Sequence, residues 1–131
     1  MKLLVPELGS EEVRAAAAHA HALAASRLAY VETRGVLGRL RADARGSIRD
    51  VDAALRLLER YWPELGVAEL DDSVARTAAD LAERLLLRGA DAVHLASALR
   101  LARHGPVRFA TWDARLAVAA SSEGLETLPA R

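Results

Sequence analysis

Short apolar segments that alternate with helical patterns constrain the fold of this chain more than any other feature. Val107–Thr111 and Leu125–Leu128 flank one helical pattern, and Leu23–Ser26 and Val67–Leu70 each lie between two others. Short strands separated by helices favour a mostly parallel sheet that helices cover on both faces. The sequence therefore predicts an α/β fold with three layers, α/β/α, in which Val107–Thr111 is a fully buried strand.

The helices are predicted from the spacing of apolar residues and from the start and stop signals at their ends. They are expected at approximately 10–22, 28–44, 47–62, 71–88, 90–104 and 113–122. In the second helix, Leu28, Val31, Gly35 and Val36 mark the face expected to be buried, and Glu32 falls within it. The fourth helix is expected to end at Gly89, the type of residue that most often follows a helix.

The composition of the chain limits the classes of protein to which it can belong. The 131 residues are expected to form a single domain, and with 52% hydrophobic but 4% aromatic residues its core should consist of Leu, Ala and Val. No apolar run approaches the roughly 18 residues of a membrane span. The absence of Cys excludes a disulfide framework and fits a cytoplasmic protein. Balanced charges, 18 basic and 18 acidic, argue against holding nucleic acid by bulk electrostatics, but not against an enzyme that binds RNA transiently.

Three carboxylates, Glu32, Asp91 and Asp113, are the candidate catalytic residues. A buried Glu32 needs a metal or a partner, and an ion pair with an Arg is the alternative. Asp91 and Asp113 stand at predicted helix starts, where each has a simpler interpretation as a helix-stabilising acid. Taken together, the three indicate a hard-cation site of the kind that phosphodiester hydrolysis needs. We expect them to converge at the carboxyl edge of the sheet and, without a cation, to raise the pKa of at least one by repulsion.

Two further residues lie near these acids in the sequence. His94 follows Asp91 by one helical turn, so an Asp-x-x-His metal pair is conceivable. A partly buried, hydrogen-bonded histidine is favoured, because Mg²⁺ and Mn²⁺ prefer carboxylate oxygens. Thr111 is the candidate hydroxyl that orients Asp113. The chain contains no glycine-rich phosphate loop and no Gly-x-Ser-x-Gly nucleophile motif.

Three segments of the chain resemble, in order and spacing, the motifs of one protein family. They are Ser26-Arg-Leu-Ala-Tyr-Val-Glu32, Gly89-Ala-Asp-Ala-Val-His-Leu-Ala-Ser-Ala98 and Phe109-Ala-Thr-Trp-Asp113, the last followed by Arg115-Leu116 and Gly124-Leu125. The family is that of PIN domains, and specifically the VapC-type toxins of bacterial toxin–antitoxin pairs. Glu32 matches its helical Glu, Asp91 matches the acid of its most recognisable string, and Asp113 matches the acid after its closing strand.

The resemblance implies a PIN-like domain over residues 1–131 that acts as a metal-dependent endoribonuclease, the toxin of a toxin–antitoxin pair. It implies Mg²⁺ or Mn²⁺ held by Asp91 and Asp113, with Glu32 as a ligand directly or through water. It also implies RNA as the substrate, a cognate antitoxin protein as the partner, and a homodimer.

The chain departs from the family pattern at its start. The family begins with a central strand that carries an Asp, usually followed by Thr or Ser, whereas residues 1–12 resemble the segment just after that motif. Either the strand is encoded upstream of Met1 or it has been lost. We favour the first, because losing a central strand leaves unpaired edges and a gap in the core. From the chain as written we expect weak cleavage or none.

Two other functions remain open from the sequence. A catalytically impaired PIN-like protein that only binds an antitoxin or another protein partner is favoured over an active nuclease by the absent first Asp. A plain α/β interaction domain, whose acids only cap helices, is disfavoured by Glu32 within the apolar stripe and by the string around Asp91.

Overall fold

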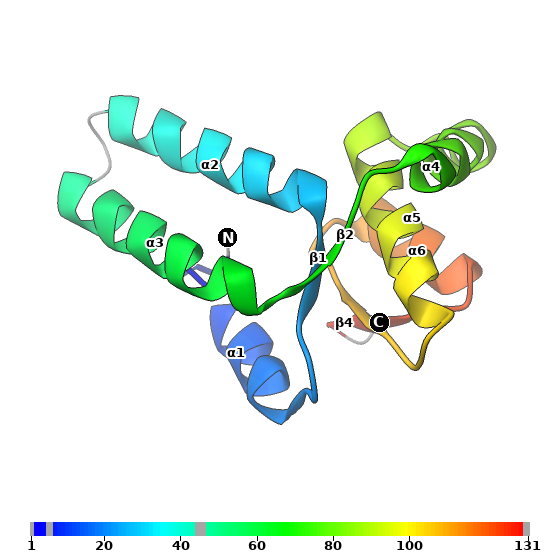
Figure 1. Cartoon of the computed structure of the whole chain (residues 1–131), viewed down its shortest axis with the longest axis horizontal. Helices are drawn as coiled ribbons and strands as arrows, with labels where there is room; N and C mark the ends of the chain where they lie inside the picture. The colour runs from blue at the N-terminus through cyan, green and yellow to red at the C-terminus, as the bar shows by residue number, and fades with distance from the viewer. Residues whose placement is uncertain (1, 5–6, 44–46, 130–131) are drawn as a thin grey trace. The chain divides into compact units, whose positions relative to one another are not determined.

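The computed structural model describes residues 2–4, 7–43 and 47–129, which form helices and short strands (Figure 1). The helices are α1 (Ser10–His19), α2 (Arg27–Ala42), α3 (Ile48–Tyr61), α4 (Asp72–Leu85), α5 (Gly89–Ala102) and α6 (Ala114–Ser122), with a 3₁₀ turn, η1 (Trp62–Glu64). The strands are β1 (Ala24–Ser26), β2 (Gly66–Ala68), β3 (Arg108–Ala110) and β4 (Glu126–Leu128). β1 pairs with β2, and β3 pairs in parallel with β4.

These elements confirm the predicted α/β class with short parallel strand pairing, and they are consistent with a three-layer PIN-like domain. Most boundaries agree with the prediction to within a few residues, and the expected end of the second helix near Ala44 lies outside the described residues. In the part of the chain that the structure describes, every helix is too short or too polar to cross a bilayer.

The end of α4 differs from the prediction. The helix stops at Leu85, and Leu86 takes a left-handed conformation with φ 52° and ψ 40°. The amide of Leu87 then bonds to the carbonyl of Ala82 at 3.2 Å, and the Leu87 side chain packs against the core. A hydrophobic contact just beyond a helix commonly fixes its end, so the chain turns here, and Gly89 begins α5 instead of ending α4.

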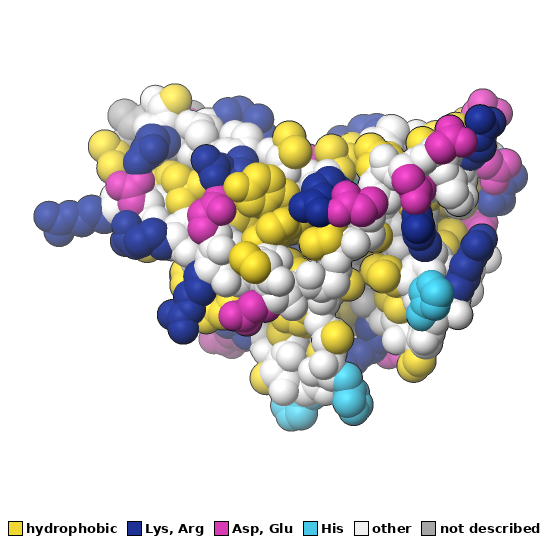
Figure 2. Space-filling model, in the orientation of Figure 1, with side chains coloured by type: hydrophobic (Ala, Val, Ile, Leu, Met, Phe, Trp, Pro, Cys, Tyr) yellow, Lys and Arg dark blue, Asp and Glu magenta, His cyan; other side chains and the backbone are white. Residues whose placement is uncertain are grey.

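The chain divides into two compact units. Unit 1 comprises Met1–Ala24 and Ala29–Gly66, and unit 2 comprises Ala25–Leu28 and Val67–Arg131. In unit 1, α2 and α3 lie side by side (Figure 1), with Leu37, Val51 and Ala54 buried between them. Over these two helices, hydrophobic side chains reach the surface among charged ones (Figure 2).

The buried face of α2 agrees only in part with the predicted one, since Leu28, Gly35 and Val36 are half-buried. Val31 is 63% exposed and Glu32 is also exposed, whereas Leu37 is fully buried, so the prediction of a buried Glu32 is wrong. The reason lies in Tyr30, whose hydroxyl donates to Glu59 at 2.7 Å and whose ring lies 5.1 Å from that of Trp62. These contacts with α3 and η1 turn the helix so that Tyr30 and Leu37, two turns apart, face its neighbours.

The core of unit 2 lies among α4, α5 and α6. It consists of Leu, Ala and Val side chains, as the composition predicted: Val74, Ala78, Leu81, Ala92, Leu95, Ala96, Ala98, Leu116, Ala119, Ala120 and Leu125. The predicted full burial of β3 is wrong, because Arg108 and Ala110 are exposed and Phe109 packs on the core. This alternation is that of a strand with one face toward the interior.

Candidate active site

Asp113 is held at the start of α6 by the helix itself. Its Oδ1 accepts hydrogen bonds from the amides of Arg115 at 2.8 Å and Leu116 at 3.0 Å, so Asp113 is an N-cap. The amide of Leu116, followed by that of Arg115 and the charge of Arg88, holds the pKa of Asp113 below its ordinary value. Repulsion among the three acids was expected to raise the pKa of at least one of them, and for Asp113 the pKa is lowered instead.

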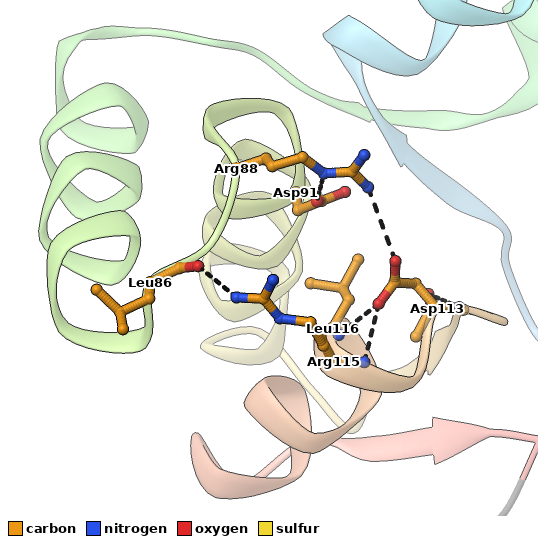
Figure 3. Close-up of polar contacts among 7 residues, drawn as sticks. Leu86, Arg88, Asp91, Asp113, Arg115 and Leu116 are labelled. Carbon is orange, nitrogen blue, oxygen red and sulfur yellow. Dashed lines mark hydrogen bonds and ion pairs between the residues drawn. The ribbon is translucent and has the colours of Figure 1, made fainter.

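Asp91 lies in the first turn of α5, and its side chain is 21% exposed. Arg88, the residue just before α5, donates from Nε to Asp91 Oδ2 at 2.8 Å. Nη2 of the same guanidinium lies 3.7 Å from Asp113 Oδ2. Figure 3 shows Arg88 interacting with both carboxylates, one on α5 and the other on the N-cap residue of α6. The guanidinium of Arg88 therefore places a positive charge beside both candidate acids, Asp91 and Asp113.

A second arginine, Arg115, supports the segment that carries Arg88. Its Nη2 donates to the carbonyl oxygen of Leu86 at 2.7 Å (Figure 3). Leu86 is the left-handed residue that ends α4, and Arg88 follows it by two positions. Neither arginine was assigned a role in the site from the sequence. The signal for Arg88 was its place three residues before Asp91, the spacing at which side chains meet on a helix.

Thr111 contacts Asp113 through the backbone. Its Oγ1 accepts a hydrogen bond from the Asp113 amide at 3.2 Å, and its own amide bonds to the carbonyl of Leu128 in β4 at 2.9 Å. The buried hydroxyl thus fixes the turn between β3 and α6, on which Asp113 stands. From the sequence, Thr111 was expected to orient Asp113 through its hydroxyl. In the structure that hydroxyl contacts the main chain of Asp113.

His94 is partly buried and hydrogen-bonded, as favoured from the sequence. Its Nδ1 lies 2.8 Å from Oγ of Ser26, which is 5% exposed and ends β1. Both residues belong to unit 2. This hydrogen bond joins α5 to the segment Ala25–Leu28, so the role of His94 is structural.

Glu32 belongs to unit 1, whereas Asp91 and Asp113 belong to unit 2. Within residues 2–4, 7–43 and 47–129, no group of three or more His, Asp or Glu side chains stands together as metal ligands. The convergence of all three acids remains a prediction. What unit 2 provides is a pair of carboxylates, Asp91 and Asp113.

The carboxylates of Asp91 and Asp113 are suited to bind a hard cation such as Mg²⁺ for two reasons. The Oδ2 atoms of Asp91 and Asp113 already face one positively charged group, the guanidinium of Arg88. Carboxylate oxygens are also the ligands that Mg²⁺ and Mn²⁺ prefer. The two acids are therefore close enough to be bridged by a single cationic group.

Comparisons with known proteins give full-length relatives. The chain is 38% identical over 131 residues to Ribonuclease VapC45 of Mycobacterium tuberculosis (strain CDC 1551 / Oshkosh), a match that covers all of this chain and 90% of that protein. It is equally similar, over the same lengths, to Ribonuclease VapC49 of Mycobacterium tuberculosis (strain ATCC 25618 / H37Rv). No family model matches the chain.

Proposed function

Because this chain belongs to the family of VapC-type PIN-domain ribonucleases, we propose that it is a metal-dependent endoribonuclease and the toxin of a toxin–antitoxin pair. The observation that supports this proposal is the meeting of Asp91 and Asp113 at one guanidinium. Two acids from separate helices, drawn to a common positive group, are a suitable pair for a bridging cation. The RNA substrate makes the cytoplasm the expected place of action.

In the proposed site, Asp91 and Asp113 hold Mg²⁺ or Mn²⁺, and Glu32 contributes as a third ligand directly or through water. Such a cation supplies a water of lowered pKa and offsets negative charge on the reacting phosphate. Asp113 is suited to bind through Oδ2, because its Oδ1 is already engaged by the two backbone amides of α6. Thr111 acts as the positioning residue that fixes the turn beneath Asp113.

The test is cleavage of RNA by the purified protein with Mn²⁺ or Mg²⁺, before and after addition of a chelator. Because weak cleavage or none is expected from the chain as written, Mn²⁺ binding is measured beside cleavage. Asp91→Asn, Asp113→Asn and Glu32→Gln are each expected to weaken Mn²⁺ binding about 10- to 100-fold and to abolish any cleavage that the wild type shows, because each removes a charged ligand. Asp72→Asn is the matched control, since Asp72 is an exposed acid of the same unit that pairs with Arg76. Full activity in Asp91→Asn, or chelator-resistant cleavage that persists in all three variants, would overturn the proposed mechanism.

The proposed partner is an antitoxin that inserts a basic side chain among the acids. An Arg fork can bridge two carboxylates and displace a cation, and Arg88 already bridges Asp91 and Asp113 in this way. Pull-down of a small basic protein encoded next to this chain, repeated with Asp91→Asn and Asp113→Asn, examines the mode of binding. Binding that both variants leave unchanged, and to which Mn²⁺ is indifferent, would mean that the antitoxin docks elsewhere. The proposed homodimer rests on the family resemblance.

A further inference from the structure

The guanidinium of Arg88 faces the two carboxylates, Asp91 and Asp113, that would hold the proposed cation. Nε of Arg88 lies 2.8 Å from Asp91 Oδ2, and Nη2 lies 3.7 Å from Asp113 Oδ2. In Asp113, Oδ1 already accepts from two backbone amides, so Oδ2, which Arg88 faces, is the oxygen left to meet a cation. A guanidinium and a metal ion repel each other and compete for the same oxygens.

The contact between Arg88 and the acids is of a kind that is easily exchanged. The side chain of Asp91 is largely buried, at 21% exposed, but that of Arg88 is 78% exposed, so water reaches the guanidinium and weakens its ion pairs. The backbone of the segment is better fixed, since α5 begins directly after Arg88 and Arg115 binds the carbonyl of Leu86. Arg88 can therefore change partner through its side-chain torsions while its main chain stays in place.

We propose that Arg88 exchanges the two carboxylates for a phosphate of the RNA chain when the divalent cation binds. This inference rests on the proposed function. A guanidinium released at the edge of the site keeps its charge and its planar set of donors, which suits it to pair with a phosphate through two hydrogen bonds. Arg88 thus acts as a positioning residue that couples metal binding to RNA binding.

The exchange has a thermodynamic consequence. Without RNA, Arg88 opposes the cation by holding its ligands. With RNA, the phosphate offers Arg88 another partner, so the cation binds more tightly. By reciprocity, the cation must strengthen RNA binding by the same factor. A residue that merely stabilised the site would have the opposite signature, because its removal would weaken the binding of the metal.

The first experiment measures the Mn²⁺ affinity of the full chain without RNA, by electron paramagnetic resonance of free Mn²⁺. Arg88→Gln is expected to bind Mn²⁺ about three- to tenfold more tightly than the wild type, the range set by the loss of two exposed ion-pair contacts. Arg76→Gln is the control, because Arg76 is an exposed arginine of unit 2 whose partner is Asp72. Equal or weaker Mn²⁺ binding by Arg88→Gln, with an unchanged unfolding transition, would overturn the inference.

The second experiment repeats the titration with a 2′-O-methyl oligoribonucleotide, which supplies backbone phosphates, and a denaturing gel checks that the oligonucleotide is still intact afterwards. In the wild type and in Arg76→Gln, the oligonucleotide is expected to tighten Mn²⁺ binding several-fold. In Arg88→Gln this gain should shrink, because the residue that connects the two ligands is absent. An equal gain in all three proteins would show that Arg88 does not carry the coupling.

Failure of this inference and failure of the proposed function give different results. If Asp91→Asn and Asp113→Asn lose Mn²⁺ binding while Arg88→Gln binds as the wild type does, the metal site stands and the exchange is wrong. If both Asn variants bind Mn²⁺ normally, the metal site itself is wrong, and the inference falls with it.

Discussion

Arg115 Nη2 donates to the carbonyl oxygen of Leu86 at 2.7 Å, so a side chain of α6 holds the left-handed residue that ends α4. A carbonyl at the C-terminal end of a helix lacks its intrahelical partner, and a guanidinium both satisfies it and complements the negative end of the dipole. The hydrogen bond thereby joins the end of one helix to the start of another. Arg88, which faces both acids, lies on the short segment between α4 and α5.

Leu86→Gly is expected to stabilise the protein by about 1 kcal/mol, because a left-handed conformation costs Leu energy that Gly does not pay. The side chain of Leu86 is 76% exposed, so its removal loses little burial. Urea unfolding provides the measurement. Leu86→Ala retains the conformational cost and is expected to match the wild type, and a glycine variant no more stable than the alanine variant would contradict the explanation.

Arg115→Met is expected to destabilise the protein by about 1 kcal/mol, because it leaves the carbonyl of Leu86 to water and keeps most of the aliphatic stem. The comparison is Arg76→Met, which removes an exposed pair between Arg76 and Asp72 and should change stability by less than about 0.5 kcal/mol. Equal urea midpoints for the two variants would show that the contact with Leu86 contributes nothing of its own.

Asp113→Asn and Asp113→Ala are expected to separate the two tasks of this residue. Asn retains an oxygen that can accept from the amides of Arg115 and Leu116, whereas Ala removes the cap. Thermal melting should therefore leave Asp113→Asn near the wild type and lower the midpoint of Asp113→Ala by a few degrees. Both variants should lose Mn²⁺ binding. If Asp113→Asn bound Mn²⁺ as tightly as the wild type, Asp113 would be a helix cap and not a metal ligand.

The lowered pKa of Asp71 predicts how the free energy of unfolding depends on pH. The hydrogen bond from Arg100, followed by that from the amide of Val74, holds the pKa of Asp71 below its ordinary value in the folded protein. Its contribution is therefore fully present above the unfolded pKa, near 3.8, and is lost as the pH falls through the lower folded value. Urea midpoints measured between about pH 6 and pH 3 should fall less steeply in Asp71→Asn than in the wild type. Parallel curves would contradict this assignment.

The order of the elements was predictable because each is encoded locally. Asp113 at a helix start and the apolar spacing of Val74, Ala78 and Leu81 on α4 are patterns within a few residues of the chain. The structure confirms both. The α/β class followed from their alternation.

The remaining features depend on contacts between segments distant in sequence. Val31 and Glu32 were wrongly placed on the buried face of α2, because Tyr30 bonds to Glu59 and its ring lies beside that of Trp62. The apolar periodicity within α2 carries no information about those partners. Arg88 was missed for a related reason. Its neighbour Asp91 is visible in the sequence, but its approach to Asp113 depends on how α5 and α6 pack.

The segment Gly89–Ala98, which resembles a family motif, is also constrained by the packing of α5. Ala92, Leu95, Ala96, Ser97 and Ala98 are at most 5% exposed, and α5 contacts both α4 and α6. Larger groups at the Ala and Ser positions would force these helices apart. The segment is therefore restricted in two ways. Its Ala and Ser side chains must stay small to fit between α4 and α6, and the proposed metal site requires a carboxylate at Asp91.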